Sequence, residues 1–150
     1  MSIFNRKIKA KQSENVEEYI ETLWKLREIS NSPARTSEIA HILGVAPPSV
    51  VDMLKKLERE KYVIYKTRKG VKLSKKGERL GRQVMRNHRL AEVLMRKTLK
   101  IVVDEVTACG VEHHMSEQFA NALCTMLKHP KTCPHGKKIP SGECCEKSIS

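Results

Sequence analysis

The chain has 150 residues, of which 39% are hydrophobic and only 4% aromatic. This length suits one domain, or two small domains that share a core, and so few aromatic residues favour a helical protein with an aliphatic core. Lys and Arg outnumber Asp and Glu by 29 to 17, which gives a formal net charge of +12. Because so basic a surface attracts polyanions, nucleic acid is favoured as the partner over a merely solvated lysine-rich surface.

No apolar run approaches the roughly 18 residues that a membrane span needs. The basic start of the chain, residues 1–12, lacks the apolar segment of a signal peptide. We therefore expect a cytoplasmic protein with no membrane partner. The cysteines are crowded near the end of the chain, at Cys109, Cys124, Cys133, Cys144 and Cys145. In a reducing compartment, such crowding favours metal or redox chemistry over structural disulfides.

The first half of the chain predicts a helix-turn-helix. Residues 1–13 are polar and are expected to form a loose arm, and apolar residues then recur at helical spacing over residues 14–29. Thr36 is expected to cap a short helix that Gly44 ends in a left-handed conformation. Pro47 and the residues after it suit the first turn of a second helix that runs to about residue 61. Two short helices joined by a tight turn form a helix-turn-helix, which is a DNA-binding motif.

A wing and a long helix are predicted next. The β-prone runs at residues 62–65 and 71–73 enclose a basic loop that ends at Gly70, which predicts a hairpin. A hairpin directly after a helix-turn-helix is a wing. Ser74 is then expected to cap a helix over about residues 75–97, and an amphipathic helix follows near residues 116–127. The segment from residue 129 onward is rich in Pro, Gly, Lys and Cys and is predicted to be loop-like.

DNA contacts are expected on the second helix of the motif and on the wing. The first turns of such a helix meet base edges in the major groove, whereas basic side chains further along bind phosphates. Ser49 can hydrogen-bond several bases, and Asp52 can accept from the amino group of cytosine. Alternatively, Asp52 pairs with a neighbouring lysine on the helix surface. The predicted contacts are Pro48, Ser49, Asp52, Lys55, Lys56, Lys66, Arg68 and Lys69.

Side chains that bind metals recur at helical spacing, which places ligand atoms on one preorganised face. They form three sets: Glu18 with Glu21, His88 with Glu92, and Cys109 with Glu112 and His113. The first two sets are also consistent with solvent-facing acids and a surface histidine. The third is more specific, because a thiol, a carboxylate and an imidazole converge beside a hydrophobic run.

These sets, downstream of a winged helix, resemble the diphtheria-toxin-repressor family, including its manganese-sensing branch. The resemblance covers about residues 14–140, nearly the whole chain. It rests on the following motifs: Val16-Glu17-Glu18-Tyr19-Ile20-Glu21, Ala46-Pro47-Pro48-Ser49-Val50, Leu73-Ser74-x-x-Gly77, His88-Arg89-Leu90-Ala91-Glu92, Cys109-x-x-Glu112-His113-x-Met115-Ser116 and Pro134-x-Gly136-x-x-Ile139-Pro140.

The resemblance implies a mainly α protein, with an N-terminal winged helix-turn-helix followed by a small helical dimerisation domain. It implies the two-domain form of the family, without the SH3-like domain. We accordingly divide the chain into a DNA-binding domain (1–74), a linker helix with a metal-binding and dimerisation domain (75–128) and a cysteine-rich tail (129–150). Such a protein acts as a homodimer on palindromic operators, and it represses metal-homeostasis genes when divalent metal is plentiful.

The resemblance also implies the ligand set. The principal ligands by position are Glu18, His88, Cys109, Glu112 and His113. Glu21 matches a ligand of the manganese branch, and Glu92 matches an ancillary ligand of the iron branch. Fe²⁺ and Mn²⁺ are favoured as the cofactor. A ligand set of carboxylates with one thiolate does not discriminate between these two metals. The thiolate leaves Zn²⁺, Co²⁺ and Ni²⁺ open, since Mn²⁺ prefers hard ligands.

Four cysteines lie outside this ligand set: Cys124, Cys133, Cys144 and Cys145. They are candidates for a second site that binds zinc or an iron–sulfur cluster, for a thiol switch, or for no special role, because their spacing matches no standard zinc finger. A winged-helix regulator that senses thiol oxidation is therefore the alternative function. An enzyme is not expected and no catalytic residue is predicted, since the sequence has no His-Glu-x-x-His motif, phosphate loop or nucleophile elbow.

Overall fold

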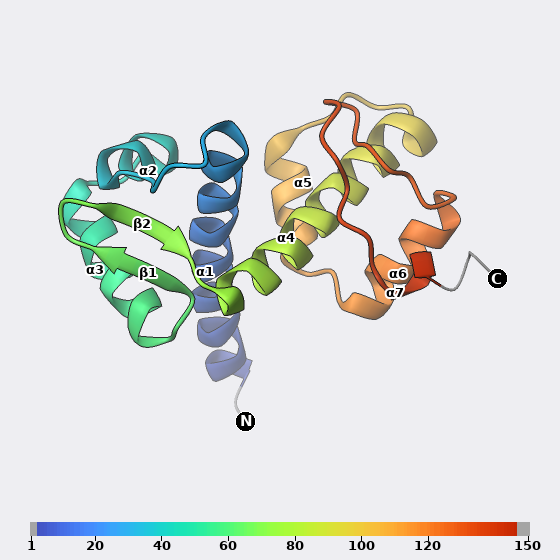
Figure 1. The fold of residues 1–150 in the computed structure, drawn as a ribbon. Coiled ribbons are helices and arrows are strands. Elements are labelled where there is room, and N and C mark those ends of the chain that lie inside the picture. Colours follow the sequence, from blue (N-terminus) through green and yellow to red (C-terminus); the bar gives the residue numbers. More distant parts are fainter. Residues whose placement is uncertain (1–2, 147–150) are drawn as a thin grey trace. The chain divides into compact units, whose positions relative to one another are not determined.

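The computed structural model describes residues 3–146, with side chains from residue 15 onward. The chain divides into two units, residues 1–81 and residues 82–150, and each is described by itself (Figure 1). The first two residues of the predicted 1–74 segment and the last four of the predicted tail lie outside the described residues. Within the described range, no helix combines the length and the apolar character that a membrane span requires.

Unit 1 contains a winged helix-turn-helix, as the sequence predicted. Its elements are α1 (Ile3–Ile29), α2 (Thr36–Leu43), α3 (Pro47–Arg59), β1 (Val63–Lys66), β2 (Gly70–Leu73) and the first turns of α4 (Lys75–Val93). The two strands pair antiparallel, with Val63 opposite Leu73 and Lys66 opposite Gly70. The mainly helical fold class and the wing are thereby confirmed.

The first helix is longer than the apolar pattern indicated. It begins at Ile3, so the loose arm expected over residues 1–13 is wrong for the described part of that range. Lys, Arg, Ala and Gln favour helices, and neither Gly nor Pro interrupts residues 3–13. A helix can therefore continue through this segment without the apolar periodicity on which the prediction relied.

Local turn chemistry sets the bend between α2 and α3. Gly44 follows α2 with a φ of 64°, in the left-handed region that glycine adopts without strain. Pro47 stands in the first turn of α3, where its missing N–H costs nothing. The N-cap of α2 is Arg35 rather than Thr36, because the Arg35 N–H donates to the Glu38 carboxylate at 2.6 Å.

An aliphatic core holds the recognition helix against the rest of unit 1. Its fully buried side chains include Ile20 of α1, Ile39 of α2, Leu54 and Leu57 of α3, and Val71 of the wing lies with them. Since α1, α2, α3 and the hairpin all bury side chains in one cluster, the solvent-facing side of α3 keeps a fixed orientation relative to the wing.

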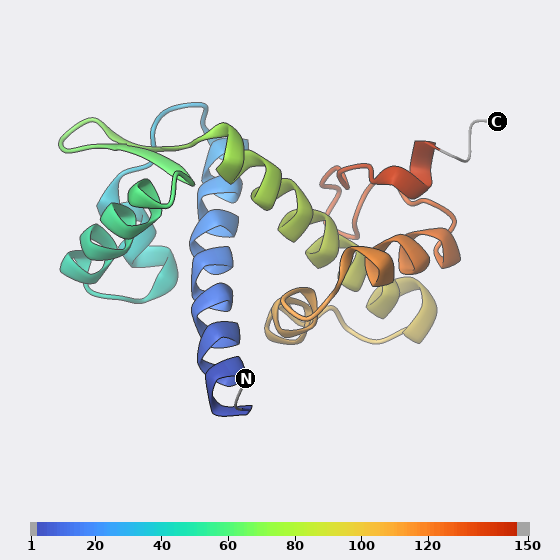
Figure 2. The same ribbon diagram turned by 90° about the horizontal axis from the view of Figure 1, so that it is seen from below.

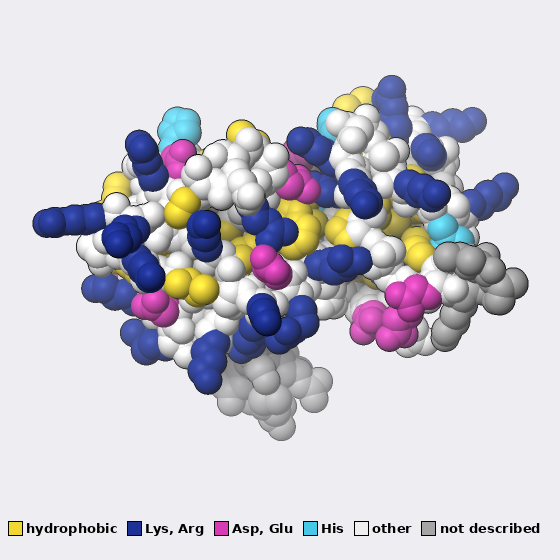
Figure 3. Space-filling model, in the orientation of Figure 1, with side chains coloured by type: hydrophobic (Ala, Val, Ile, Leu, Met, Phe, Trp, Pro, Cys, Tyr) yellow, Lys and Arg dark blue, Asp and Glu magenta, His cyan; other side chains and the backbone are white. Residues whose placement is uncertain are grey.

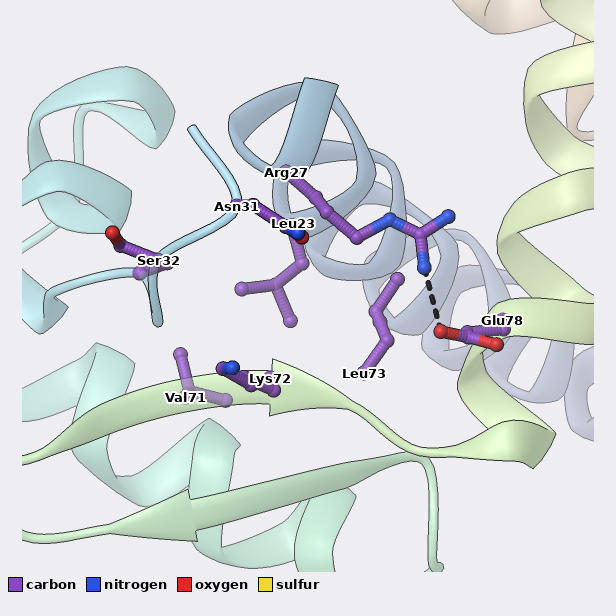
Figure 4. A pocket seen from close by; sticks show the side chains of 9 residues that line it. Leu23, Arg27, Asn31, Ser32, Val71, Lys72, Leu73 and Glu78 are labelled. Atoms are coloured by element: carbon purple, nitrogen blue, oxygen red, sulfur yellow. Dashed lines mark hydrogen bonds and ion pairs between the residues drawn. The ribbon is translucent and has the colours of Figure 1, made fainter. Parts of the chain in front are cut away.

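A pocket of about 280 Å³ lies beside the end of α1, within unit 1 (Figure 4). Leu23 and Leu73 contribute apolar surface to its wall. The Arg27 guanidinium donates to the Glu78 carboxylate at 2.6 Å, which connects α1 to the start of α4. No predicted DNA contact or metal ligand lines this pocket. The pocket therefore lies apart from the candidate sites, and the ion pair beside it holds the start of α4 to α1.

The wing joins α4 through the Ser74-x-x-Gly77 pattern. Ser74 Oγ accepts the N–H of Gly77 at 3.0 Å and donates to the Lys61 carbonyl at 2.6 Å. A β-carbon on Gly77 would lie 2.0 Å from the Tyr62 carbonyl oxygen. Glycine is therefore required for the first turn of α4 to lie this close to the chain that enters β1.

Unit 2 is helical throughout its regular structure. The second half of α4 continues into a π-helical stretch, η1 (Leu94–Leu99), and is followed by α5 (Glu105–Glu112), α6 (Glu117–Met126) and α7 (Glu143–Glu146). Helix α7 contacts α6 (Figure 2). The long helix predicted to reach residue 97 thus has α-helical geometry only to Val93.

The segment after α6 is loop-like as predicted, but it is packed into unit 2. It returns across α4 (Figure 1), where Cys133 and Ile139 share a buried cluster with Leu90 and Val93. Its end forms the short helix α7, which the sequence pattern did not indicate. The packing of this segment brings its cysteines and histidines next to α4 and α6.

The close approach at Gly77 gives a test of the fold. We expect Gly77→Ala to lower the free energy of unfolding by roughly 1–3 kcal/mol, because the added β-carbon must displace backbone. Gly110 in α5 is the matched control, since a β-carbon there meets nothing within 4 Å and alanine favours helices. Thermal denaturation measures both variants, and equal stability of Gly77→Ala and the wild type would contradict the geometry.

Candidate metal centre and nucleic-acid interface

Helix α5 carries Glu105, Cys109 and Glu112, with His113 directly after it, and a capping aspartate fixes where the helix begins. The Asp104 carboxylate accepts the N–H groups of Val106 and Thr107 at 3.2 and 3.0 Å. Hydrogen bonds from the Thr107 hydroxyl and backbone lower the pKa of Asp104, so it stays an ionised acceptor near neutral pH. The cap therefore sets the register in which Glu105 and Cys109 share one helix face.

The first group of ligand atoms comes from one turn at the end of α5. The Sγ atom of Cys109 lies 3.3 Å from Nε2 of His113, and this nitrogen lies 3.8 Å from Oε1 of Glu112. Glu112 is buried, and the other two are half-buried. These three side chains offer their ligand atoms within 4.8 Å of one another, as the i, i+3, i+4 spacing predicted.

His88 of α4 contacts Glu112 of this group and also belongs to a group with Glu92 and Glu105. Its Nδ1 side donates to a carboxylate oxygen of Glu112. Its Nε2 atom lies 3.4 Å from Oε1 of Glu92 and 3.3 Å from Oε2 of Glu105. An imidazole whose one nitrogen is held by a carboxylate is oriented to coordinate a cation through the other. His88 is 2% exposed, so its environment is formed by these side chains rather than by bulk water.

Glu92 belongs to two groups of ligand atoms. Oε1 of Glu92 faces His88 and also lies 2.9 Å from Nδ1 of His135. Cys133 completes the group that Glu92 forms with His135. Burial acts to raise the pKa of Glu92, but hydrogen bonds from His88 and Cys133 and the nearby imidazoles outweigh it and lower the pKa to about 2. Glu92 is therefore an anion across the physiological pH range.

These buried acids fit a divalent cation. Glu92 and Glu112 are each 2% exposed, and buried carboxylates are costly unless cations or hydrogen bonds compensate them. Within the described residues, Oε2 of Glu92 is buried without a hydrogen-bond partner. Oxygen, nitrogen and sulfur donors together suit a first-row transition metal rather than Mg²⁺ or Ca²⁺.

The remaining two predicted ligands lie on α1, in unit 1. Glu18 is exposed, and Glu21 is buried with an oxygen 2.7 Å from Nζ of Lys25. The other five predicted ligands lie in unit 2 in two groups, which the hydrogen bond between His88 and Glu112 links: Cys109, Glu112 and His113 in one, and His88 and Glu92 in the other.

Two residues of these groups were not predicted from the sequence. Glu105 precedes Cys109 by four residues and Glu112 by seven, so helical spacing alone places it on the same face. His135 follows Cys133 in a Cys-x-His pattern, which is a common ligand spacing, but only the fold brings it to Glu92. The first signal was readable in the sequence, whereas the second required the return of the chain across α4.

The four cysteines predicted as a second site separate into two places. Cys124, Cys144 and Cys145 lie together with His129, whereas Cys133 lies with Glu92 and His135. Burial, followed by the neighbouring thiols, raises the pKa of Cys124 to about 12. Burial also acts on Cys145, but hydrogen bonds from the Gly142 backbone and His129 outweigh it and lower its pKa to about 7.

The predicted DNA contacts lie on the solvent-facing side of α3 and on the wing. Lys56 is half-buried, and the other seven are exposed: Pro48, Ser49, Asp52, Lys55, Lys66, Arg68 and Lys69. Figure 3 shows Lys and Arg side chains crowded over this part of unit 1. Asp52 has no ion pair with Lys55 or Lys56 among the described residues, so its carboxylate faces solvent and can meet a base edge.

Two family models together match almost the whole chain. Residues 11–71 match the model described as "Iron dependent repressor, N-terminal DNA binding domain". Residues 74–141 match the model described as "Iron dependent repressor, metal binding and dimerisation domain". The boundary between the two models falls at the end of the wing, and the second match ends before Cys144.

Curated relatives include two regulators of the same description. The HTH-type transcriptional regulator MntR of Lysinibacillus sphaericus (strain C3-41) is 35% identical over 125 residues, which cover 77% of this chain and 86% of the relative. The HTH-type transcriptional regulator MntR of Bacillus subtilis (strain 168) is 38% identical over 106 residues, which cover 68% and 72%.

Solved structures of similar fold come from metal-dependent regulators. A manganese-dependent transcriptional repressor in complex with manganese matches with a TM-score of 0.79 and 25% identity over 85% of this chain. The manganese regulator SloR matches with a TM-score of 0.74 and 34% identity over 84%. IdeR of T. acidophilum matches with a TM-score of 0.72 and 27% identity over 83%. This chain spans 59% of the length of each of these solved chains.

The cap of α5 provides a test of the site geometry. We expect Asp104→Ala to weaken divalent-metal binding a few-fold, because the first turn of α5 loses the acceptor that fixes its register. Asp104→Ser is the matched control, since serine also caps helices and should keep the affinity near that of the wild type. Isothermal titration with Mn²⁺ or Co²⁺ measures both. Unchanged metal affinity in Asp104→Ala would show that the cap does not position the ligands.

Proposed function

Because the chain belongs to the family of iron-dependent repressors and its manganese-responsive relatives, we propose that it is a divalent-metal-activated transcriptional repressor. It binds palindromic operators of metal-homeostasis genes as a homodimer in the cytoplasm, and no enzymatic step is part of this activity. The observation that carries the proposal is the buried group of acids, imidazoles and a thiol around His88, in a chain whose other unit is a winged helix-turn-helix.

The ligand set of the effector metal follows from the groups in unit 2. Cys109, Glu112 and His113 offer one group of ligand atoms. His88, whose Nδ1 atom is hydrogen-bonded to Glu112, faces Glu92 and Glu105 through its Nε2 atom in a second group. The effector metal takes its ligands from these two groups. The family resemblance adds Glu18 and Glu21 of α1. When bound, the metal supplies the positive charge that compensates the buried carboxylates and the Cys109 thiolate. The mixed donor set supports Fe²⁺ or Mn²⁺ as the physiological metal, with Zn²⁺, Co²⁺ and Ni²⁺ as competitors.

The DNA is bound through α3 and the wing. Ser49 and Asp52 lie in the first two turns of α3, the part of a recognition helix that meets base edges. Lys66, Arg68 and Lys69 on the wing bind phosphates, which supply affinity rather than sequence reading. In a dimer, two such helices read half-sites about one helical turn of DNA apart. The net charge of +12 favours this association.

Exposed apolar residues in unit 2 support a dimer. Val102 and Val106 are 80% and 81% exposed, and Leu99 and Ile101 next to them are also exposed. An apolar run that solvent reaches in a monomer marks an interaction surface. A second copy of the chain is the occupant that the matched dimerisation domain supports.

Metal dependence of DNA binding tests the proposal. Binding to a fragment of the protein's own promoter region should strengthen by roughly 5–150-fold when chelator is replaced by Mn²⁺ or Fe²⁺, the usual range of coupling between two sites. Fluorescence anisotropy measures it, with Co²⁺ and Zn²⁺ compared in parallel. DNA binding of equal strength with chelator and with every metal would reject the corepressor model.

A pair of variants tests whether the metal dependence of DNA binding arises from the candidate metal centre in unit 2. His113→Ala should remove the metal response while the protein stays folded by circular dichroism. His114→Ala is the matched control, because its Nδ1 atom lies 3.0 Å from the Gly110 carbonyl oxygen of its own helical turn and it belongs to no ligand group. A full metal response in His113→Ala would place the effector metal elsewhere.

The dimer surface is tested by a charge in the apolar run. We expect Val106→Asp to shift the protein from dimer to monomer in analytical ultracentrifugation and to weaken binding to a palindromic operator. Ile29→Asp is the matched control, since Ile29 is 79% exposed at the end of α1 in unit 1. If Val106→Asp stayed dimeric, the contact between copies would involve another surface.

A further inference from the structure

The end of unit 2 gathers a separate set of ligand atoms. Cys124 comes from α6, Cys144 and Cys145 come from α7, and His129 comes from the loop after α6. One sulfur or nitrogen atom from each lies within 4.8 Å of the other three. None of these four residues belongs to the groups around His88 and Glu92, so the set is independent of the proposed effector centre.

The distances within this set match those around a single tetrahedral ion. Sγ of Cys124 lies 3.5 Å from Nδ1 of His129 and 3.7 Å from Sγ of Cys145, and the sulfurs of Cys144 and Cys145 are 3.9 Å apart. Around tetrahedral Zn²⁺, with bonds of about 2.3 Å to sulfur and 2.0 Å to nitrogen, thiolate sulfurs lie about 3.8 Å apart and sulfur and nitrogen about 3.5 Å apart. The side chains are therefore already arranged as four corners of one coordination sphere.

Other uses of the three thiols fit less well. The sulfur–sulfur distances of 3.7 and 3.9 Å are far longer than the roughly 2.05 Å of a disulfide bond, so these three cysteines are not joined by a disulfide. An iron–sulfur cluster distributes its four protein ligands over two or more iron atoms, which requires ligands spread more widely than around one ion. A single ion is the occupant that these spacings favour.

The backbone turns sharply to bring the histidine into place. Lys128 and His129 have φ values of 62° and 51°, in the left-handed region that non-glycine residues rarely adopt. The His129 N–H donates to the Cys124 carbonyl at 2.9 Å, which ends α6 and turns the imidazole back toward the thiol of Cys124. Two consecutive residues in this region cost energy, which is typical of positions where function or dense packing requires a given geometry.

A buried cation supports the charge of the thiolates. The Arg86 guanidinium of α4 donates to Sγ of Cys144 at 3.2 Å, and Arg86 is only 5% exposed. A β-carbon on Gly142 would lie 2.6 Å from this guanidinium, so the Arg86 side chain packs closely against the chain just before α7. Three thiolates, one imidazole and one divalent ion carry a net charge of −1, which the arginine balances.

We propose that Cys124, His129, Cys144 and Cys145 form a structural Zn²⁺ site that holds α7 against α6 and α4. Three sulfurs and one nitrogen fill a tetrahedral sphere without an open position, which is the arrangement of structural zinc. Soft thiolates select Zn²⁺ over Mn²⁺, so this site and the effector centre take different metals. The match to the metal-binding family model ends at residue 141, before two of the four ligands.

The test measures zinc that survives a chelator. Purified protein is dialysed against excess EDTA, and its zinc content is measured by mass spectrometry. The wild type should keep one Zn²⁺ per chain, and Cys144→Ser and Cys145→Ser should lose it. Cys133→Ser is the matched control, because its thiol is buried nearby but belongs to the Glu92 group. His113→Ala should also keep its zinc, which separates this site from the effector centre.

Co²⁺ gives a second readout on the wild-type chain, in case the serine variants do not fold. After denaturation in chelator and refolding with one equivalent of Co²⁺, absorption should show thiolate-to-cobalt charge transfer and the intense visible bands of tetrahedral geometry. Loss of zinc from the wild type in EDTA, equal loss in Cys133→Ser, or a six-coordinate cobalt spectrum would each overturn the proposal. Zinc retained by Cys144→Ser would do the same.

Discussion

The contacts of His88 are the interaction on which the rest of unit 2 depends. This imidazole lies on α4 and is held by Glu112 of α5 on one side, while Glu92 and Glu105 face its other nitrogen. Three acidic groups around one buried histidine are electrostatically unfavourable without additional positive charge. The packing of α5 against α4 and the affinity for a cation are therefore two consequences of the same arrangement. Because α4 also begins directly after the wing, the helix that carries His88 starts in the DNA-binding unit.

Local chemistry explains why much of the fold was predictable from the sequence. Gly44, Pro47 and the Ser74-x-x-Gly77 pattern each impose a specific backbone geometry, and each stands where the sequence placed it. The candidate ligands Cys109, Glu112 and His113 could be grouped from the sequence for the same reason, because they share one helical turn. The N-terminal arm was wrong because a helix without an apolar face has no periodicity to detect. Helix propensity alone carried that information.

Long-range packing explains what the sequence could not show. His135 reaches Glu92, and His129 joins three cysteines, only because the segment after α6 folds back over α4 and ends in α7. No spacing rule links residues such as Glu92 and His135, or His129 and Cys144, across irregular chain. The cysteines were recognisable as unusual, but their division between two clusters depends on this path. Charge and turn chemistry thus indicated a DNA-binding protein, and the family resemblance indicated its activation by metal. The fold then brought together the groups of candidate ligand atoms.

The central claim is that metal bound around His88 and DNA bound by unit 1 are energetically coupled. Coupling between two sites is reciprocal, so DNA must strengthen metal binding by the same factor by which metal strengthens DNA binding. Isothermal titration of Mn²⁺ or Fe²⁺ into the protein, with and without a saturating promoter fragment, measures this directly. Metal binding should be tighter with DNA present, by the factor found from the DNA titrations. Equal metal affinity in the presence and absence of DNA would contradict it.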